Sequence, residues 1–413
     1  MTGPMLRRGP RPLPLHLILA STRAITAMAA IPPSASGWNN WSAGWPISKA
    51  GRAEAARIAA ALGAGHHHPE AFRAAVLRRL AQADRALIAG IAAYRRHPWQ
   101  REVPEPAVLW QEGGSRLLDY GGEGVPLLVV PSLVNRAQVL DLAPGHSMLR
   151  HLAAHGSRVL LLDWGWPGEV ERAFTLTDYI AGRLERVLDA APVAALGPVV
   201  LVGYCMGGLL ALAAALRRPD RLRALALLAT PWDFTAGGED VAARSQAMAA
   251  LLPRLEPLLA ATGTLPVDII QSLFAGLDPW AIARKFRAFA RMDPADPRTI
   301  LFVALEDWLN NGVPMAAPVA RECLGGWYGR NEPGSGRWRV AGAVVKPENL
   351  AMPAFLAIPQ ADRIVPPASA LALAARIPQA QVHMTPAGHI GMAAGSRAER
   401  ALWSPLLQWL AGL

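Results

Sequence analysis

Residues 198–217 have the sequence PVVLVGYCMGGLLALAAALR, which combines a strand, a tight turn and the start of a helix. The apolar run Pro198–Val202 is typical of a strand covered on both faces, and Leu209–Arg217 is typical of a helix. Between them, a cysteine is flanked by small residues in a strand-turn-helix arrangement. A Cβ on the flanking residues would collide with neighbouring backbone in so tight a turn. We therefore predict a nucleophile elbow with Gly203, Gly207 and Gly208 around Cys205.

The elbow gives Cys205 the surroundings of a nucleophile. It lies at the start of a helix, where free N–H groups and the helix dipole favour a thiolate. The N–H of Met206 can then stabilise an oxyanion. The alternatives are an inert buried cysteine or a dinucleotide-binding loop. A dinucleotide loop would have the pattern GxGxxG after the first strand and an acidic residue on the next one, and the sequence has neither.

A cysteine nucleophile needs a base and an acid, which in this architecture follow it in the order acid, then base. Asp362 comes directly after the apolar run Ala354–Ile358, and His389 comes after the last predicted strand, next to Gly388. Separately, these are an ordinary turn aspartate and a loop histidine. Their order and loop positions together predict a Cys-His-Asp triad. His383 is a weaker candidate because it lies within a strand pattern.

The second oxyanion donor is expected in the loop that follows the apolar run Leu127–Pro131. Its residues are Ser132, Leu133, Val134 and Asn135. We predict that the N–H of Val134 is the donor and that the side chain of Asn135 orders the loop.

Short apolar runs and helical stretches alternate outside the elbow, which predicts a mostly parallel sheet with right-handed crossovers. The other runs are Arg158–Asp163, Leu222–Ala229 and Gln381–Met384, and a hairpin of Val108–Trp110 and Arg116–Tyr120 precedes them all. Helices are predicted over Val139–His155, Thr177–Ala190 and Glu399–Leu410.

The strand signal is missing from about Asp233 to Ala343, which divides the chain into four predicted segments. They are a helical N-terminal extension (1–105), the first part of the sheet domain (106–232), a helical lid (233–344) and the second part of the sheet domain (345–413). The run His66–His68 ends in Pro69 and lacks the i, i+4 spacing of helical metal ligands, so a polar turn is expected there. We predict no metal and no cofactor.

Composition limits the class of protein. The 413 residues are 52% hydrophobic and contain only two cysteines, which excludes a disulfide framework and predicts a reducing compartment. The formal net charge of +10 fits either an arginine-rich solvated surface or the steering of an anionic substrate. No nucleic-acid-binding motif is present.

The N-terminus has some features of a secretory signal. Arginines precede the mildly apolar run Leu13–Ala30, and Ala27-Met28-Ala29 is similar to a cleavage site. However, His16 and Arg23 interrupt the run, whereas a signal has a continuously apolar region. We expect a peripheral helix that packs on the body or touches an apolar surface, in a cytoplasmic protein without a membrane span.

Four motifs together resemble the polyhydroxyalkanoate synthases, also called poly(3-hydroxyalkanoate) polymerases. They are Val130–Arg136 leading to Val139–Leu142, the GYCMGG elbow, Ala361–Pro367 and Gly388–Gly391. The resemblance extends from about Pro104 to Leu413 and includes Leu301–Trp308. It implies the α/β-hydrolase fold with a mostly parallel sheet, a helical lid insertion and a helical N-terminal extension.

The resemblance also implies an activity, namely the condensation of (R)-3-hydroxyacyl-CoA into polyester with release of CoA. Cys205 would carry the acyl group, His389 would be the general base and Asp362 the acid beside it. A 3-hydroxyacyl-CoA and the polyester chain would be the partners, with association with polyester granules and a homodimer or helper subunit as further expectations. A lid that excludes water fits this activity, and six large apolar side chains would either serve that purpose or form the ordinary core of the lid: Phe274, Trp280, Phe286, Phe289, Met292 and Trp308.

Two alternatives remain open. A polyester depolymerase or acyl-CoA thioesterase would use the same triad with a lid that admits water. A non-catalytic granule-associated protein would keep the fold without using the triad.

Overall fold

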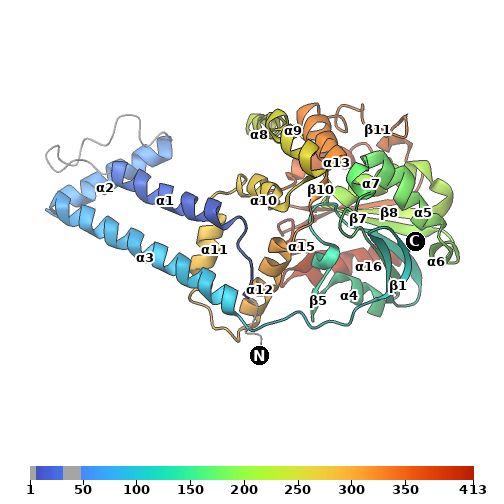
Figure 1. Cartoon of the computed structure of the whole chain (residues 1–413), viewed down its shortest axis with the longest axis horizontal. Coiled ribbons are helices and arrows are strands. Elements are labelled where there is room, and N and C mark those ends of the chain that lie inside the picture. Colours follow the sequence, from blue (N-terminus) through green and yellow to red (C-terminus); the bar gives the residue numbers. More distant parts are fainter. Residues whose placement is uncertain (1–5, 31–47) are drawn as a thin grey trace. The chain divides into compact units, whose positions relative to one another are not determined.

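The computed structural model describes residues 6–30 and 48–413, which divide into two compact units. The smaller unit combines residues 1–99 with residues 278–303, and the larger unit combines residues 100–277 with residues 304–413. Figure 1 shows the smaller unit as helices and the larger one as a sheet with helices around it.

The larger unit is built on an eight-stranded sheet with the order β1-β2-β6-β3-β7-β8-β13-β14. The pairs β1–β2 and β2–β6 are antiparallel, and all other neighbours are parallel. The predicted mostly parallel sheet is therefore confirmed. The strands are β1 (Ala107–Glu112), β2 (Ser115–Gly121), β3 (Val125–Val130), β6 (Ser157–Asp163), β7 (Val199–Tyr204), β8 (Leu222–Leu228), β13 (Ala354–Pro359) and β14 (Ala380–Thr385).

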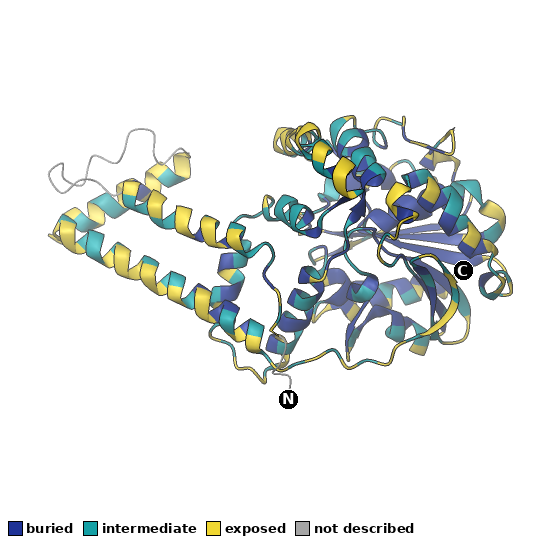
Figure 2. Ribbon diagram, in the orientation of Figure 1, coloured by how far each residue is buried: buried dark blue, intermediate teal, exposed yellow. Residues whose placement is uncertain are grey.

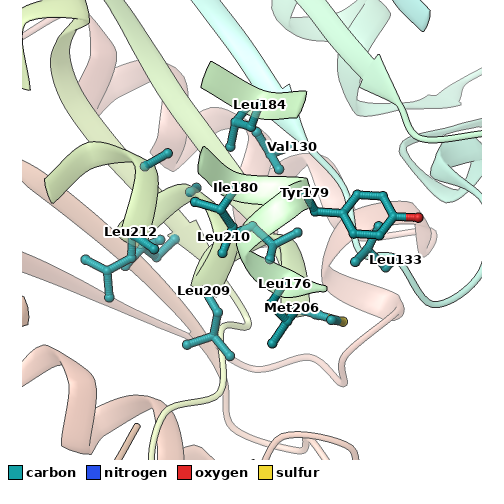
Figure 3. Packing of buried hydrophobic residues seen from close by; sticks show 14 of the residues in the cluster. Val130, Leu133, Leu176, Tyr179, Ile180, Leu184, Met206, Leu209, Leu210 and Leu212 are labelled. Atoms are coloured by element: carbon teal, nitrogen blue, oxygen red, sulfur yellow. The ribbon is translucent and has the colours of Figure 1, made fainter. Parts of the chain in front are cut away.

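Helices cover both faces of this sheet, which explains why its central strands are almost continuously apolar. Every residue of β7 and of β13 is buried. In Figure 1, α5 (Glu185–Asp189), α6 (Ala191–Ala194) and α7 (Met206–Arg217) lie on one side of the sheet, and α4 (Met148–Ala154) and α16 (Ser404–Leu410) on the other. Figure 3 shows Leu210 of α7 beside Ile180 of the π-helical segment η4 (Asp178–Leu184), and Leu184 of η4 beside Val130 of β3.

The predicted helix Val139–His155 is only partly correct. A 3-10 turn, η2 (Ala137–Leu140), and a small hairpin of β4 (Asp141–Ala143) and β5 (His146–Ser147) precede the helix α4. The hairpin turns at Pro144-Gly145, where Gly145 has a φ of 74°. Proline followed by glycine favours a turn over a continuous helix, and the apolar periodicity concealed this signal.

A mostly helical insertion lies between β8 and β13, as predicted. Its elements are α8 (Glu239–Ala249), α9 (Leu252–Thr262), β9 (Thr264–Leu265), α10 (Val267–Ala275), α11 (Ala281–Phe289), α12 (Pro297–Asn310), β10 (Met315–Ala316), α13 (Ala317–Arg321), the π-helical η6 (Glu322–Gly329), β11 (Arg339–Val340) and β12 (Ala343–Val344). The short helices α14 (Pro367–Ala374) and α15 (Gly391–Ala394) follow β13 and β14.

The smaller unit contains α1 (Leu13–Ala30), α2 (Lys49–Ala64) and α3 (Pro69–Arg96), together with α11 from the insertion. Its core joins Leu87, Ile91 and Tyr94 of α3 to Phe286 and Phe289 of α11. The two backbones approach closely, since a Cβ on Gly90 would lie 2.8 Å from the carbonyl carbon of Phe286. Figure 2 shows that the outer faces of these helices are exposed. Among the described residues, no helix is long and apolar enough to cross a membrane.

This packing shows that part of the predicted lid belongs to the smaller unit. Phe286, Phe289 and Met292 belong to the core of the smaller unit and its margin, so these side chains seal that unit rather than a cavity. Trp280 is 38% exposed. Apolar spacing along α11 shows that one face is buried, but it does not reveal which element buries it.

Candidate active site

Cys205 lies at the turn between β7 and α7 in a strained backbone conformation. Its φ is 56° and its ψ is −127°, a region that residues with a Cβ seldom occupy. The turn is held by its hydrogen bonds, because the N–H of Cys205 donates to the carbonyl of Leu228 on β8 at 2.8 Å, and the Cys205 carbonyl accepts from Gly208 at 3.0 Å. A strained strand-to-helix turn of this kind is typical of a nucleophile elbow, and Cys205 lines a cavity there.

Glycines permit this turn because the backbone segments approach closely. A Cβ on Gly203 would lie 2.7 Å from the carbonyl oxygen of Gly207, and a Cβ on Gly207 would lie 2.5 Å from the carbonyl oxygen of Pro131. Gly208 faces Thr230, whose Cγ2 would be 2.7 Å from an added Cβ. All three distances are too short for a side chain. The start of α7 can therefore pack against the ends of β3 and β8 only because these three residues are glycines.

Asp362 and His389 are joined directly. The Nδ1 of His389 lies 2.7 Å from Oδ2 of Asp362, and both side chains are almost fully buried. The other carboxylate oxygen, Oδ1, accepts from the N–H groups of Ile364 at 2.8 Å and Val365 at 2.9 Å. The loop after β13 therefore fixes the carboxylate, and the carboxylate fixes the ring.

The charge of Cys205 acts on the imidazole of His389, which in turn contacts Asp362, so the structure brings the three predicted triad residues together. Burial lowers the pKa of His389, but the charge on Cys205 and the hydrogen bonds with Asp362 and Cys205 outweigh it and raise that pKa to about 10. The raised pKa favours the charged imidazolium form of His389.

Tyr204 supports the loop that carries His389. The sequence showed only that this tyrosine precedes Cys205 and did not indicate the supporting role. Its hydroxyl donates to the backbone carbonyl of His389 at 3.2 Å, and the two ring centroids lie 5.4 Å apart. Burial raises the pKa of this phenol well above its usual range, so it remains a donor.

The two predicted oxyanion donors differ in their surroundings. Met206 is the first residue of α7, where helix N–H groups have no partner within the helix. The N–H of Val134 already donates to the hydroxyl of Ser132 at 2.9 Å. Asn135 has a φ of 63°, and its side-chain oxygen accepts from Gln271 of α10 at 3.4 Å, so it does link its loop to the insertion.

These residues line a cavity of about 190 Å³ within the larger unit. Its wall includes Cys205, Met206, Val134 and His389, and the rest is largely apolar, with contributions from Met248, Phe274, Trp308, Leu324, Trp327 and Tyr328. Two exposed arginines, Arg244 and Arg363, also line it. The cavity therefore offers an apolar chamber beside the thiol and positive charge at its exposed side.

The remaining candidates lie elsewhere or take other roles. His383 is in β14, where its Nε2 is 2.9 Å from the carbonyl of Ala401, and it does not line the cavity. Cys323 does line the cavity, but burial and the neighbouring Glu322 raise the pKa of its thiol well above the usual range. His68 caps α3 by accepting from the N–H of Glu70. No cluster of three metal-ligating side chains occurs in the part of the chain that the structure describes.

Comparison with known proteins identifies the fold and the family of this chain. The profile of the alpha/beta hydrolase fold family matches residues 125–395. The poly(3-hydroxyalkanoate) polymerase subunit PhaC of Synechocystis sp. is 30% identical over 292 residues, which cover 69% of this chain and 77% of that protein. The corresponding subunit of Allochromatium vinosum is 28% identical over 290 residues, covering 69% and 80%.

Among solved structures, the alpha/beta hydrolase fold protein from Nakamurella multipartita is similar to this chain. It is 18% identical, covers 76% of this chain and all of its own (100%), and has a TM-score of 0.46. The extent and identity of the PhaC matches go further than a shared fold. The chain belongs to the poly(3-hydroxyalkanoate) polymerase family, on the α/β-hydrolase fold.

Proposed function

We propose that this protein polymerises (R)-3-hydroxyacyl-CoA through a thioester on Cys205 and releases CoA. The observation that supports this most strongly is the presence of Cys205 and His389 on one largely apolar cavity, with His389 held by Asp362 at 2.7 Å, in a chain of this family. A cysteine in place of the serine of most such elbows suits a thioester substrate.

In the loading step, the Sγ of Cys205 attacks the carbonyl carbon of the acyl-CoA thioester. Since Nδ1 of His389 is engaged with Asp362, Nε2 is the ring nitrogen left to hold the thiol proton. The N–H of Met206 stabilises the oxyanion. The C–S bond to CoA then breaks, and the CoA sulfur takes the proton from His389. One thioester replaces another, so little bond energy is lost.

In the elongation step, the 3-hydroxyl of another acyl unit attacks the enzyme thioester. His389 takes the hydroxyl proton as the C–O bond forms and returns it to the sulfur of Cys205 as the C–S bond breaks. Water would give a free acid in the same way. The largely apolar wall around the thiol favours the hydroxyacyl chain over water, which supports a polymerase over a thioesterase.

The exposed side of the cavity suits the other end of the substrate. Arg244 and Arg363 are exposed guanidinium groups on the cavity wall, and CoA carries several phosphates. Charge-assisted hydrogen bonds from arginine to phosphate are stronger than neutral ones. We therefore assign these two arginines to CoA binding.

The hydrogen bond between Val134 and Ser132 bears on the second oxyanion donor. The N–H of Val134 serves an oxyanion only if it leaves the Ser132 hydroxyl. A Ser132→Ala variant distinguishes the donors: kcat is kept or raised if the freed N–H of Val134 is the donor. A fall in kcat would assign the hydroxyl instead.

The proposal is tested by incubating the purified protein with 3-hydroxybutyryl-CoA and measuring CoA, polymer and free acid together. Polymer formation in step with CoA release, abolished in Cys205→Ala, is the expected result. CoA release with free acid alone would identify a thioesterase, and polyester breakdown would identify a depolymerase. No turnover, with Cys205→Ala behaving like the wild type, would favour the non-catalytic granule-associated protein.

A cytoplasmic location on polyester granules belongs to the same proposal, because the product is a water-insoluble polymer. A homodimer or helper subunit belongs to it as well. Adding candidate subunits to the assay and measuring the lag before polymer appears would test that part separately.

A further inference from the structure

The net positive charge of this protein comes from the smaller unit. Its residues include eighteen Lys and Arg against six Asp and Glu, a net charge of +12. The larger unit has 23 basic and 25 acidic residues, a net charge of −2, and together these give the +10 of the chain. The cavity lined by Cys205 belongs to the larger unit, whose own net charge is slightly negative.

Part of this charge forms a row along α3. Arg78, Arg85 and Arg96 are separated by seven and eleven residues, close to two and three helical turns, so they share one face of the helix. All three are exposed, and none forms an ion pair with the described residues. Within residues 6–30 and 48–413, no acidic side chain therefore neutralises this row.

A different kind of surface is exposed on α1. Leu17, Ile18 and Ile25 are 39%, 60% and 68% exposed, and the exposed arc that contains them carries no charged side chain. The only charged residue of α1, Arg23, turns instead to Asp84 of α3 at 3.3 Å. The opposite side of α1, with Ala20, packs in the core of the unit. The helix is thus held by one face and leaves an uncharged face open, on which these three apolar side chains alternate with Ser21, Thr22 and Thr26, whose hydroxyls bond to carbonyls of the helix itself.

We infer that the smaller unit binds an anionic phospholipid surface. A row of unpaired arginines attracts lipid phosphates, and exposed leucine and isoleucine side chains gain by leaving water at the acyl boundary. Nucleic acid would account for the arginines only, since its backbone offers nothing to the apolar face of α1. Lipid binding of this kind does not depend on the acyl-transfer chemistry.

Binding is measured by sedimentation of the full-length protein with vesicles of phosphatidylcholine mixed with phosphatidylglycerol, and with phosphatidylcholine alone. We expect binding to the mixed vesicles that weakens as salt is raised. Replacing the arginine row (Arg78→Gln, Arg85→Gln, Arg96→Gln) should weaken it at least about tenfold. Ile18→Ser with Ile25→Ser should weaken it also.

A matched control removes three exposed arginines of the larger unit, Arg223→Gln, Arg339→Gln and Arg400→Gln. This control should bind vesicles like the wild type, and circular dichroism should show that every variant is folded. Absence of wild-type binding to the mixed vesicles would overturn the inference, and so would equal loss in the control. Binding to a DNA duplex that needs the arginine row but not the two isoleucines, without vesicle binding, would replace lipid by nucleic acid.

Discussion

Asp362→Asn should abolish most of the activity while leaving the fold intact, for a reason found in the hydrogen bonds of this carboxylate. Its Oδ1 accepts from two backbone N–H groups, at 2.8 and 2.9 Å. An asparagine keeps both bonds only by placing its oxygen there, which turns its NH₂ toward Nδ1 of His389. The NH₂ can only donate. Nδ1 must then accept, so the ring proton moves to Nε2, the nitrogen that has to take the proton of Cys205.

The magnitude follows from this change of tautomer. The corresponding aspartate-to-asparagine change in the Ser-His-Asp triad of serine proteases lowers kcat by about 10⁴. We expect a loss of similar size here, ~5 kcal/mol in the activation free energy. Release of CoA from 3-hydroxybutyryl-CoA under saturating substrate measures it, and KM should change little because the carboxylate lies behind the histidine.

The matched control is Asp178→Asn. Asp178 also accepts from a backbone N–H and a hydroxyl, both of Thr175, but it faces no histidine. Its variant should keep its activity within about tenfold and its Tm within a few degrees. If Asp362→Asn is folded and keeps its activity at the level of this control, Asp362 does not set the tautomer of His389, and the proposed triad is wrong.

Three further predictions concern His389, the glycine turn beside Cys205 and Arg363. The pKa of His389 is raised to about 10, so its ring stays charged through neutral pH. Its contribution to the free energy of unfolding is complete below pH 6.5 and is lost as the pH rises toward 10. NMR titration should show a lower pKa of His389 in Cys205→Ala, and an unchanged pKa would exclude the charge interaction between Cys205 and His389. Gly207→Ala should lower the free energy of unfolding by about 3 kcal/mol, because the added Cβ would lie 2.5 Å from a backbone oxygen. The control Gly391→Ala, whose Cβ would have nothing within 4 Å, should change it by less than about 0.5 kcal/mol. Denaturant titrations measure both. Arg363→Gln should raise KM for the acyl-CoA about tenfold and reduce its salt dependence at constant kcat, whereas a fall in kcat alone would remove Arg363 from CoA binding.

The sheet and the elbow could be predicted from the sequence because their signals are local. Apolar runs report burial on both faces, and the glycines around Cys205 report close backbone contacts that the structure contains. The loop positions of Asp362 and His389 follow from the strands before them. Their 2.7 Å contact then needs only parallel neighbours, β13 and β14, whose carboxyl ends meet at one edge.

The partners of the insertion could not be predicted in the same way. Phe286 and Phe274 are both apolar residues in predicted helices, yet one is buried against Tyr94 in the smaller unit and the other lines the cavity. The difference arises from contacts far apart in the sequence. The hydrogen bond from the N–H of Val134 could not be predicted either, because it depends on the side-chain rotamer of Ser132.

The central claim is that Cys205 carries the growing acyl chain, and the most direct measurement is mass spectrometry of the protein after rapid mixing with 3-hydroxybutyryl-CoA and acid quenching. We predict a hydroxyacyl group on the peptide that contains Cys205, removed by hydroxylamine and absent from Cys205→Ala. Cys323, the other free cysteine, lies on the same cavity and should remain unmodified. Turnover with an acyl group on Cys323 or another residue, or with no acyl-enzyme at any time, would contradict this role of Cys205.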